Sequence, residues 1–288
     1  MQTAKKSKIK ETLAKTGFFI AACASIAAVA IICLFLFANG IPAMGEIGVF
    51  KFLLGTSWKP LNNSFGIFPM ILGSIYVTAG AILIGVPAGV LCAVFMARFC
   101  PQKLYRVLKP AIDLLAGIPS IVYGFFGLMV VVPLMQDIFG GSGKSMLTAS
   151  LLLGIMILPT IIGVTETALR AVPENYYEGA LALGATHEQS VFFVLLPAAK
   201  SGIMAGVVLG IGRAIGEAMA VSIVAGNQAI MPRGLLKGVR TLTTNIVLEM
   251  GYAADLHRDA LIATAVVLFV FILLINLLFN LLKGRDKS

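Results

Sequence analysis

The chain has 288 residues, of which 59% are hydrophobic and only 12% are charged. A water-soluble domain carries about 25% charged residues, and a soluble fold of this size cannot hide so much apolar surface from water. The composition therefore excludes a soluble enzyme, a disordered chain and a small disulfide-stabilised domain. It predicts an all-α protein that crosses a membrane several times.

The net charge of +9 suits a membrane protein, because Lys and Arg collect on the cytoplasmic side of such proteins. We therefore expect no nucleic-acid partner. The four cysteines lie in or beside apolar segments, which predicts free thiols that pack as small apolar side chains. His187 and His257 are far apart and have no Cys or His at ligand spacing, so we expect no metal site and no cofactor.

Six apolar segments are long enough to cross a bilayer as helices, because about 20 helical residues span its apolar core. We expect a kink in the second segment, which contains Gly85, Pro87 and Gly89. The first segment follows a basic stretch but is too long for a cleavable signal peptide, so it should remain as a membrane anchor. The six segments cover residues 17–38, 68–99, 111–135, 147–165, 203–225 and 260–282.

The distribution of Lys and Arg predicts the orientation. With a cytoplasmic N-terminus, the cytoplasmic segments carry fourteen of these residues and the outer segments carry seven, so both termini should be cytoplasmic. The outer segment 226–259 holds four of the seven and is a local exception. We expect a basic cytoplasmic N-terminus (1–16), one membrane domain (17–282) whose longest cytoplasmic loop is 166–202, and a short cytoplasmic tail (283–288).

The segment Gly140–Ser145, which reads Gly-Gly-Ser-Gly-Lys-Ser, resembles the phosphate-binding loop of nucleotide-binding proteins. That motif requires a glycine six positions before the lysine, where this sequence has Ile138. It also requires a preceding strand in a soluble domain, whereas this segment joins two membrane spans. We interpret it as a flexible turn and predict no ATP site in this chain.

The long cytoplasmic loop has the pattern of two short helices. Glu174 suits the first turn of a helix, which Gly184 can end in the left-handed conformation. Thr186 and Gln189 predict a capping box that begins a second helix, and Pro197 should end it. Such a pair either rests on the membrane surface or serves as a docking element for a soluble partner.

The same loop resembles the EAA loop of ABC importer permeases in its spacing throughout. Gly179 stands for the middle residue of that motif and Val194 for an isoleucine. The resemblance implies helices that insert into a groove on a separate ATPase subunit, so that this chain is not itself an enzyme. It assigns ATPase coupling to Glu178, Gly179, Ala180, Gly184, Leu196 and Pro197.

Three further segments resemble phosphate permeases, and the second of them is similar to the C-type subunit in particular. They are Leu-Ala-Gly-Ile-Pro-Ser-Ile-Val-Tyr-Gly (115–124), Gly-Arg-Ala-Ile-Gly-Glu-Ala-Met-Ala-Val (212–221) and Gly-Thr-Ser-Trp-Lys-Pro (55–60). The resemblance implies the six-helix architecture of type I (MetI-like) importers in a bacterial plasma (inner) membrane. The chain would form half of a phosphate pathway.

The implied partners are an A-type permease subunit, two ATPase subunits and an extracytoplasmic phosphate-binding protein, in addition to phosphate and membrane lipid. The nearest alternative is the same machine for another oxyanion, sulfate or molybdate. A second alternative, of another class, is a secondary transporter that works alone.

The fifth apolar segment contains two charged residues, Arg213 and Glu217, which are costly in a membrane unless they are paired or hydrated. Four residues apart on one helix, they share a face and can pair. Gly202, Gly206 and Gly210 fall on the same stripe and form a close-packing pattern. The stripe should therefore face a neighbouring helix or a central pathway. Two interpretations remain open: a structural ion pair, or an arginine that faces phosphate and is held by Glu217.

Other polar residues in the spans are also candidates for the substrate pathway. Ser120 and Tyr123 follow Pro119, which should kink the third span, and both could touch substrate. Residues of these types more often make hydrogen bonds between membrane helices, so this interpretation stays open for both.

Overall fold

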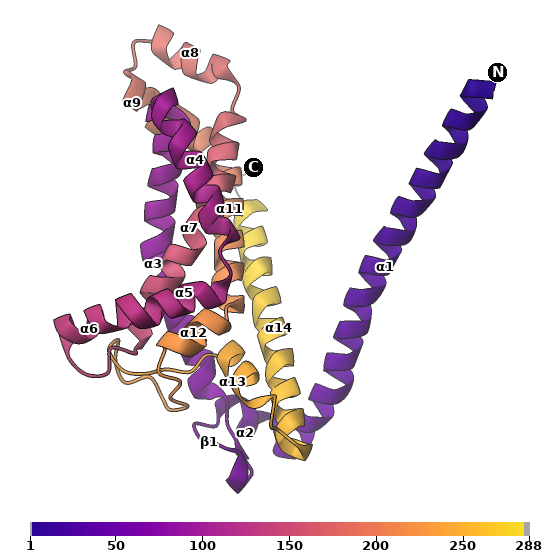
Figure 1. The fold of residues 1–288 in the computed structure, drawn as a ribbon, viewed down its shortest axis with the longest axis vertical. Coiled ribbons are helices and arrows are strands. Elements are labelled where there is room, and N and C mark those ends of the chain that lie inside the picture. Colours follow the sequence, from indigo (N-terminus) through magenta and orange to yellow (C-terminus); the bar gives the residue numbers. More distant parts are fainter. Residues whose placement is uncertain (1, 285–288) are drawn as a thin grey trace.

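The computed structural model describes residues 2–284 of the chain. Long helices lie side by side, with a small two-stranded hairpin at one end (Figure 1). Within the described residues, five helices are long and apolar enough to cross a membrane. A sixth is counted if the pair His187–Ala198 and Lys200–Gly216, which is bent by 69°, forms one span. The predicted all-α membrane class is confirmed.

The first half of the chain carries six helices, a hairpin and three short turns. The helices are α1 (Gln2–Ile47), α2 (Val49–Leu54), α3 (Phe68–Val94), α4 (Gln102–Gly117), α5 (Ser120–Phe126) and α6 (Val132–Phe139). The hairpin pairs β1 (Trp58–Lys59) with β2 (Ser64–Phe65) in antiparallel register across a 3-10 turn, η1 (Pro60–Asn62). The π-helical turns η2 (Phe95–Phe99) and η3 (Gly127–Val131) continue α3 and α5.

The second half carries eight helices and one more π-helical turn, η4 (Val191–Leu195). The helices are α7 (Met146–Arg170), α8 (Glu174–Ala182), α9 (His187–Ser190), α10 (Leu196–Ala198), α11 (Lys200–Gly216), α12 (Met219–Val224), α13 (Leu242–Glu249) and α14 (Asp255–Gly284). We call the end of the molecule that carries α8 and α9 the α8 end, and the end that carries the hairpin and α13 the α13 end (Figure 1).

Helix α7 forms the centre of the bundle, between α3 and α11, because both neighbours present glycines to it. A Cβ atom added to Gly85 of α3 would lie 2.8 Å from the Gly154 carbonyl oxygen, and one added to Gly202 of α11 would lie 2.3 Å from the Ala168 Cβ. Membrane helices gain stability from such close contact because burial from lipid supplies little driving force. The predicted close-packing stripe of Gly202, Gly206 and Gly210 is confirmed, since all three face α7.

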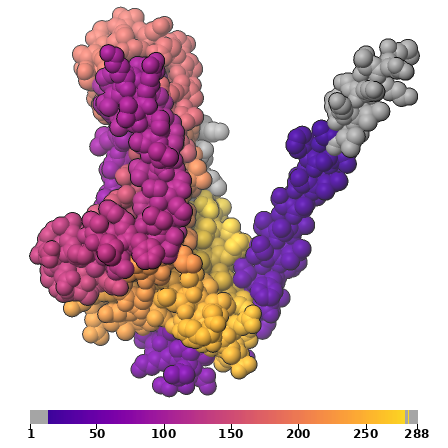
Figure 2. Space-filling view, viewed as in Figure 1, coloured from indigo at the N-terminus to yellow at the C-terminus, as the bar shows by residue number. Residues whose placement is uncertain are grey.

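Helix α1 diverges from the bundle over most of its length (Figures 1 and 2). It packs on α14 near its C-terminal end, where a Cβ atom added to Gly40 would lie 3.2 Å from the Ala263 Cα. Many of its exposed side chains, such as Phe18 and Ile26, are large and apolar, as expected of a helix surrounded by lipid or by another membrane chain.

The third and fifth spans differ from the sequence prediction. Residues 111–117 belong to α4, a separate helix, and the span itself begins at Ser120 and extends to Phe139. The reason is Pro119, which disfavours helical geometry at the preceding residue; Ile118 is extended, with ψ of 126°. The fifth span is not one helix over 203–225, because it is interrupted at Glu217 between α11 and α12.

Candidate functional site

Helices α8 and α9 form the predicted helix–turn–helix. Gly184 adopts φ of +89°, so the left-handed helix end is confirmed. The capping box is also confirmed: the Gln189 N–H donates to the Thr186 hydroxyl oxygen at 3.3 Å, and the Thr186 N–H donates to the Gln189 side-chain oxygen at 2.9 Å. The second helix continues through η4 and ends at Ala198, one residue beyond the predicted end at Pro197.

The surface of this loop combines polar and apolar groups. Glu178 and Gly179 are exposed while Ala180 is buried. Leu183 is 91% exposed and Phe193 is 77% exposed. Helix α8, which ends just before Leu183, lies beyond the long helices in Figure 1. An exposed apolar surface of this kind on a polar loop suits contact with a partner.

Arg98, at the end of η2, attaches the loop to the bundle. Its Nη1 lies 3.2 Å from a Glu174 carboxylate oxygen on α8, and its Nη2 donates to the Leu169 carbonyl oxygen on α7 at 3.2 Å. Within the loop, the Tyr177 hydroxyl and His187 Nδ1 are 2.8 Å apart. A displacement of α8 would therefore act directly on the ends of α3 and α7.

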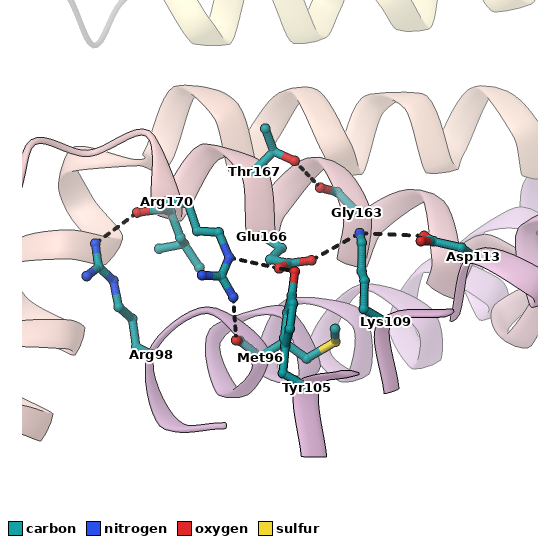
Figure 3. A network of polar contacts seen from close by, with 10 residues as sticks. Met96, Arg98, Tyr105, Lys109, Asp113, Gly163, Glu166, Thr167 and Arg170 are labelled. Carbon is teal, nitrogen blue, oxygen red and sulfur yellow. Dashed lines mark hydrogen bonds and ion pairs between the residues drawn. The ribbon is translucent and has the colours of Figure 1, made fainter. Parts of the chain in front are cut away.

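A buried carboxylate, Glu166, connects α7 to α4 at the same end (Figure 3). Its Oε1 accepts hydrogen bonds from the Tyr105 hydroxyl at 2.7 Å and from Arg170 Nε at 2.9 Å. Its Oε2 accepts one from Lys109 Nζ at 3.2 Å. Arg170 Nη2 also donates to the Met96 carbonyl oxygen of η2 at 3.0 Å. Glu166 therefore joins α7 and α4, and Arg170 extends the network to the end of α3.

The charge of Glu166 changes the acidity of its neighbours on α4. The hydrogen bond to Glu166 raises the pKa of Tyr105. Burial alone would lower the pKa of Lys109, but the hydrogen bond and charge of Glu166, together with Asp113, raise it. Both groups therefore keep their protons near neutral pH. Sequence reasoning missed this network, although the i, i+4 spacing of Glu166 and Arg170 at the end of an apolar run was an available signal.

The interruption of the fifth span separates the two charged residues that were expected to pair. The Glu217 backbone is extended, with ψ of 126°, and its carboxylate accepts a hydrogen bond from the Ala220 N–H at 3.1 Å, which caps α12. Arg213 instead donates to the Thr160 hydroxyl oxygen of α7 at 3.4 Å. In the described part of the chain no ion pair joins Arg213 and Glu217, so the predicted pairing on one helical face is wrong.

Two causes of this interruption are visible. Gly212 and Gly216 bracket the last turn of α11, where glycine weakens a helix. The Thr243 hydroxyl, on α13, donates to the Glu217 carbonyl oxygen at 2.9 Å, which satisfies a group that a continuous helix would have bonded.

Ser120 and Tyr123 lie at the start of α5, just after the Pro119 break. Ser120 is half-buried, and the buried Tyr123 donates through its hydroxyl to the Leu115 carbonyl oxygen at 2.8 Å. Helix α5 packs on α12, since a Cβ atom added to Gly124 would lie 3.1 Å from the Ala220 Cα. The structure therefore brings the two interrupted spans together at their breaks.

A second buried carboxylate, Glu249, organises the α13 end. It accepts hydrogen bonds from Trp58 Nε1 at 2.8 Å and from Arg240 Nη1 at 2.5 Å, and its Oε2 lies 2.8 Å from His257 Nε2. Arg240 Nη1 also donates to the Asn245 side-chain oxygen at 3.1 Å. The loop after α12 and helix α13 are thus held against the hairpin and the start of α14.

Two smaller predictions are confirmed. The Gly140–Ser145 segment is a turn between α6 and α7 in which three glycines have positive φ, and the Ser145 hydroxyl oxygen caps α7 by accepting from the Thr148 N–H. The four cysteines are free.

Similarity to known proteins identifies the family of this chain. Residues 85–285 match the family described as binding-protein-dependent transport system inner membrane component, and the chain belongs to this family. It is 40% identical over 277 residues to a probable ABC transporter permease protein, YqgH, of Bacillus subtilis, which covers 93% of this chain and 90% of that protein. It is 37% identical over 261 residues to the phosphate transport system permease protein PstC of Mesorhizobium japonicum, over 83% and 80% of the two chains.

Solved structures confirm the predicted MetI-like permease fold. The inward-facing MetNI methionine ABC transporter superposes with a TM-score of 0.63 at 20% identity, over 81% of this chain and all of that one. A bacterial alginate ABC transporter gives a TM-score of 0.60 at 16% identity, over 92% and 94% of the two chains. The chain is thus a multi-pass membrane permease component of an ABC importer, in which ATP hydrolysis belongs to a separate subunit.

Proposed function

We propose that this chain is the permease subunit of an ATP-driven importer of inorganic phosphate and that it forms half of the translocation pathway. The assignment of phosphate as the substrate rests on the 37% identity, over 83% of this chain, to a protein named as a phosphate transport permease. The chemistry of the interrupted span supports it, because an anion that crosses a low-dielectric region needs a fixed cation.

Arg213 is the cation that we place in the pathway. Its guanidinium is permanently charged and has several donors in a fork that fits phosphate oxygens. Among the described residues its side chain makes one hydrogen bond, a long one to Thr160, so most of its donors are available. In this proposal Glu217 shapes the break by capping α12, and Ser120 and Tyr123 contribute to the wall of the pathway on α5.

Charge-neutral variants of the complete transporter separate these roles. Arg213→Gln should abolish phosphate uptake while the subunits still assemble, since the fixed cation is lost. Glu217→Gln keeps the side-chain oxygen that caps α12, so uptake should persist. The double variant Arg213→Gln/Glu217→Gln should remain inactive. Recovery of uptake in the double variant would refute a substrate role for Arg213 and indicate that the two charges only balance each other.

The choice of phosphate over other oxyanions is tested by competition. Unlabelled phosphate should suppress uptake of labelled phosphate, whereas sulfate and molybdate at the same excess should not. If only sulfate or only molybdate suppressed the uptake, the transporter would be an importer of that oxyanion instead. Uptake by the purified chain without an ATPase would support a secondary transporter instead.

The α8–α9 loop is the proposed docking element for the ATPase subunits, with Glu178, Gly179, Ala180, Gly184, Leu196 and Pro197 as its coupling residues. The complete assembly would contain this chain, an A-type permease subunit, two ATPase subunits and an extracytoplasmic phosphate-binding protein. Figure 1 draws the N-terminal end of α1 and the C-terminal end of α14 toward the α8 end. This arrangement supports a topology in which both termini and the loop are cytoplasmic.

Gly184→Val tests docking, and Gly17→Val, on α1 and outside the loop, is its matched control. Valine at φ of +89° is strained, so the turn should distort at a local cost of about 1–2 kcal/mol and co-purification with the ATPase should fall. Gly17 has no positive φ, and a Cβ atom there meets nothing within 4 Å, so its variant should behave normally. Normal co-purification and uptake in Gly184→Val would contradict the docking role.

Labelling with an impermeant thiol reagent tests the orientation. In intact cells, Lys144→Cys should react and Glu178→Cys should be protected, in a background without other cysteines. The reverse pattern would invert the topology.

A further inference from the structure

An open pocket with a volume of about 420 Å³ lies between the C-terminal end of α6 and the loop that follows α12. Most of its lining is apolar: Phe139 from α6, Leu147 from α7, and Leu235 and Leu236 from the loop. Phe139, Leu235 and Leu236 are each about half-exposed. Figure 2 shows α6 as a projecting lobe with the loop below it, at the periphery of the molecule.

Backbone hydrogen bonds fix this loop to the start of α7. The Leu147 N–H donates to the Leu235 carbonyl oxygen at 2.9 Å, and the Met146 N–H donates to the Lys237 carbonyl oxygen at 3.0 Å. The exposed leucines are therefore held in place by the bundle, and they lie level with the first turn of a membrane span.

Two cations, Arg233 and Lys237, complete the lining, and Lys144 lies two residues before Met146. In the described part of the chain, none of the three side chains has a hydrogen bond or an ion pair. Arg240, a few residues further along the same loop, is in contrast engaged with Glu249. The free cations of segment 226–259 thus include two that border an apolar pocket.

The depth of the pocket in the membrane follows from the spans around it. The candidate span Met146–Arg170, which runs along the bundle, begins at the pocket, while α5 and α6, which lie across the long helices, end there (Figure 1). The ends of spans lie at the boundary between the apolar core of a bilayer and its headgroups. At that depth, exposed leucines can contact acyl chains, while the longer Arg and Lys side chains reach the headgroup layer. Unpaired cations there attract anionic lipids.

We propose that this pocket binds one anionic phospholipid, such as phosphatidylglycerol. The acyl chain lies against Phe139, Leu235 and Leu236, and the headgroup phosphate is bound by Arg233 and Lys237. Free phosphate is also an anion, but it has no apolar part that could contact the leucines and Phe139. The apolar lining therefore favours a lipid over free phosphate. The proposal also gives a physical reason for basic residues in a segment that breaks the usual distribution of Lys and Arg. It holds whichever ion the transporter carries.

Native mass spectrometry of the complete, delipidated transporter, titrated with phosphatidylglycerol, measures the binding. Arg233→Gln/Lys237→Gln should weaken it roughly 30-fold, since each cation near an anionic membrane surface contributes about a factor of five. The matched control is Lys59→Gln/Arg258→Gln, which removes two exposed cations outside the pocket lining and should change little. Leu235→Ser/Leu236→Ser should weaken binding with both cations intact.

Several outcomes would overturn the proposal. Equal loss in the control variant would indicate a diffuse electrostatic effect. Displacement of the lipid by inorganic phosphate, or no effect of the leucine substitutions, would indicate a site for the free anion. Equal binding of phosphatidylcholine would remove the role of the cations. If the pocket variants bound lipid normally but lost the extracytoplasmic binding protein, the surface would be a protein-docking site.

Discussion

The two ends of the bundle are organised by the same device, a buried carboxylate with two basic partners, but the partners differ in burial. At the α8 end, the side chains of Lys109 and Arg170 are 30% and 46% exposed. At the α13 end, Arg240 and His257 are each 16% exposed. Lys109 and Arg170 can therefore reach water if Glu166 moves, whereas Arg240 and His257 stay mostly buried.

The elements that each carboxylate joins differ as well. Glu166 joins α4 to α7, and α4 has extended backbone at both ends, at Cys100 and at Ile118. Glu249 joins the hairpin, the loop after α12 and the start of α14, which all pack around one apolar cluster that includes Phe52. The α13 end is therefore a fixed clamp, while the α8 end contains a helix that can be displaced.

The largest effect is expected from removing the clamp. Glu249→Ala should destabilise the transporter by about 3–5 kcal/mol, because it removes the buried carboxylate that neutralises the mostly buried Arg240 and accepts from Trp58. Thermal unfolding of the purified complex measures it. Asp259→Ala, at an exposed position of α14 nearby, is the control and should have little effect. If Glu249→Ala lowered the free energy of unfolding by less than about 1 kcal/mol, Glu249 would not be the clamp of the α13 end.

Glu166→Ala should cost less stability, about 2 kcal/mol, because its basic partners can turn toward solvent. Its main effect should be on coupling, since α4 loses its polar attachment to α7: ATP hydrolysis by the assembled transporter should continue while phosphate uptake falls. Asp113→Ala, which removes an exposed partner of Lys109, should leave both rates near normal. Parallel loss of hydrolysis and uptake would show that Glu166 is purely structural.

Tyr105→Phe should have the smallest effect. It removes one of the three hydrogen bonds to Glu166 and leaves both cations in place, at a cost of about 1–2 kcal/mol. A thermal shift as large as that of Glu166→Ala would mean that the hydroxyl, rather than the charge, holds α4.

The α8–α9 loop could be predicted from sequence because its determinants are local. Gly184 ends a helix and the Thr186–Gln189 pair begins the next one, and each signal acts within a few residues. The four uninterrupted spans could also be predicted, because each is a continuous apolar segment long enough to cross a bilayer. The break at Pro119 could have been predicted from the proline itself. The third span was instead predicted from apolar composition, which continues across Pro119.

The interruption at Glu217 could not be predicted in this way, because helical periodicity assumes a helix that continues. The hydrogen bond that supports the break comes from Thr243, 26 residues further along the chain. The Glu249 clamp is even less local, since Trp58 lies 191 residues away from it. Such contacts depend on how the elements pack, which no local pattern records.

The glycine contacts of α7 have a mechanical consequence. Because the glycines of α3 and α11 leave no spare room against α7, sliding between these helices would drive α7 side chains such as Ile161 into the neighbouring backbone. These three helices should therefore translate and rotate together as one slab during a transport cycle. Relative motion is then expected in elements joined to that slab by non-helical residues, and these include α4 and α5 on either side of Pro119 and α12 after Glu217. The residues proposed for the pathway lie at these joints.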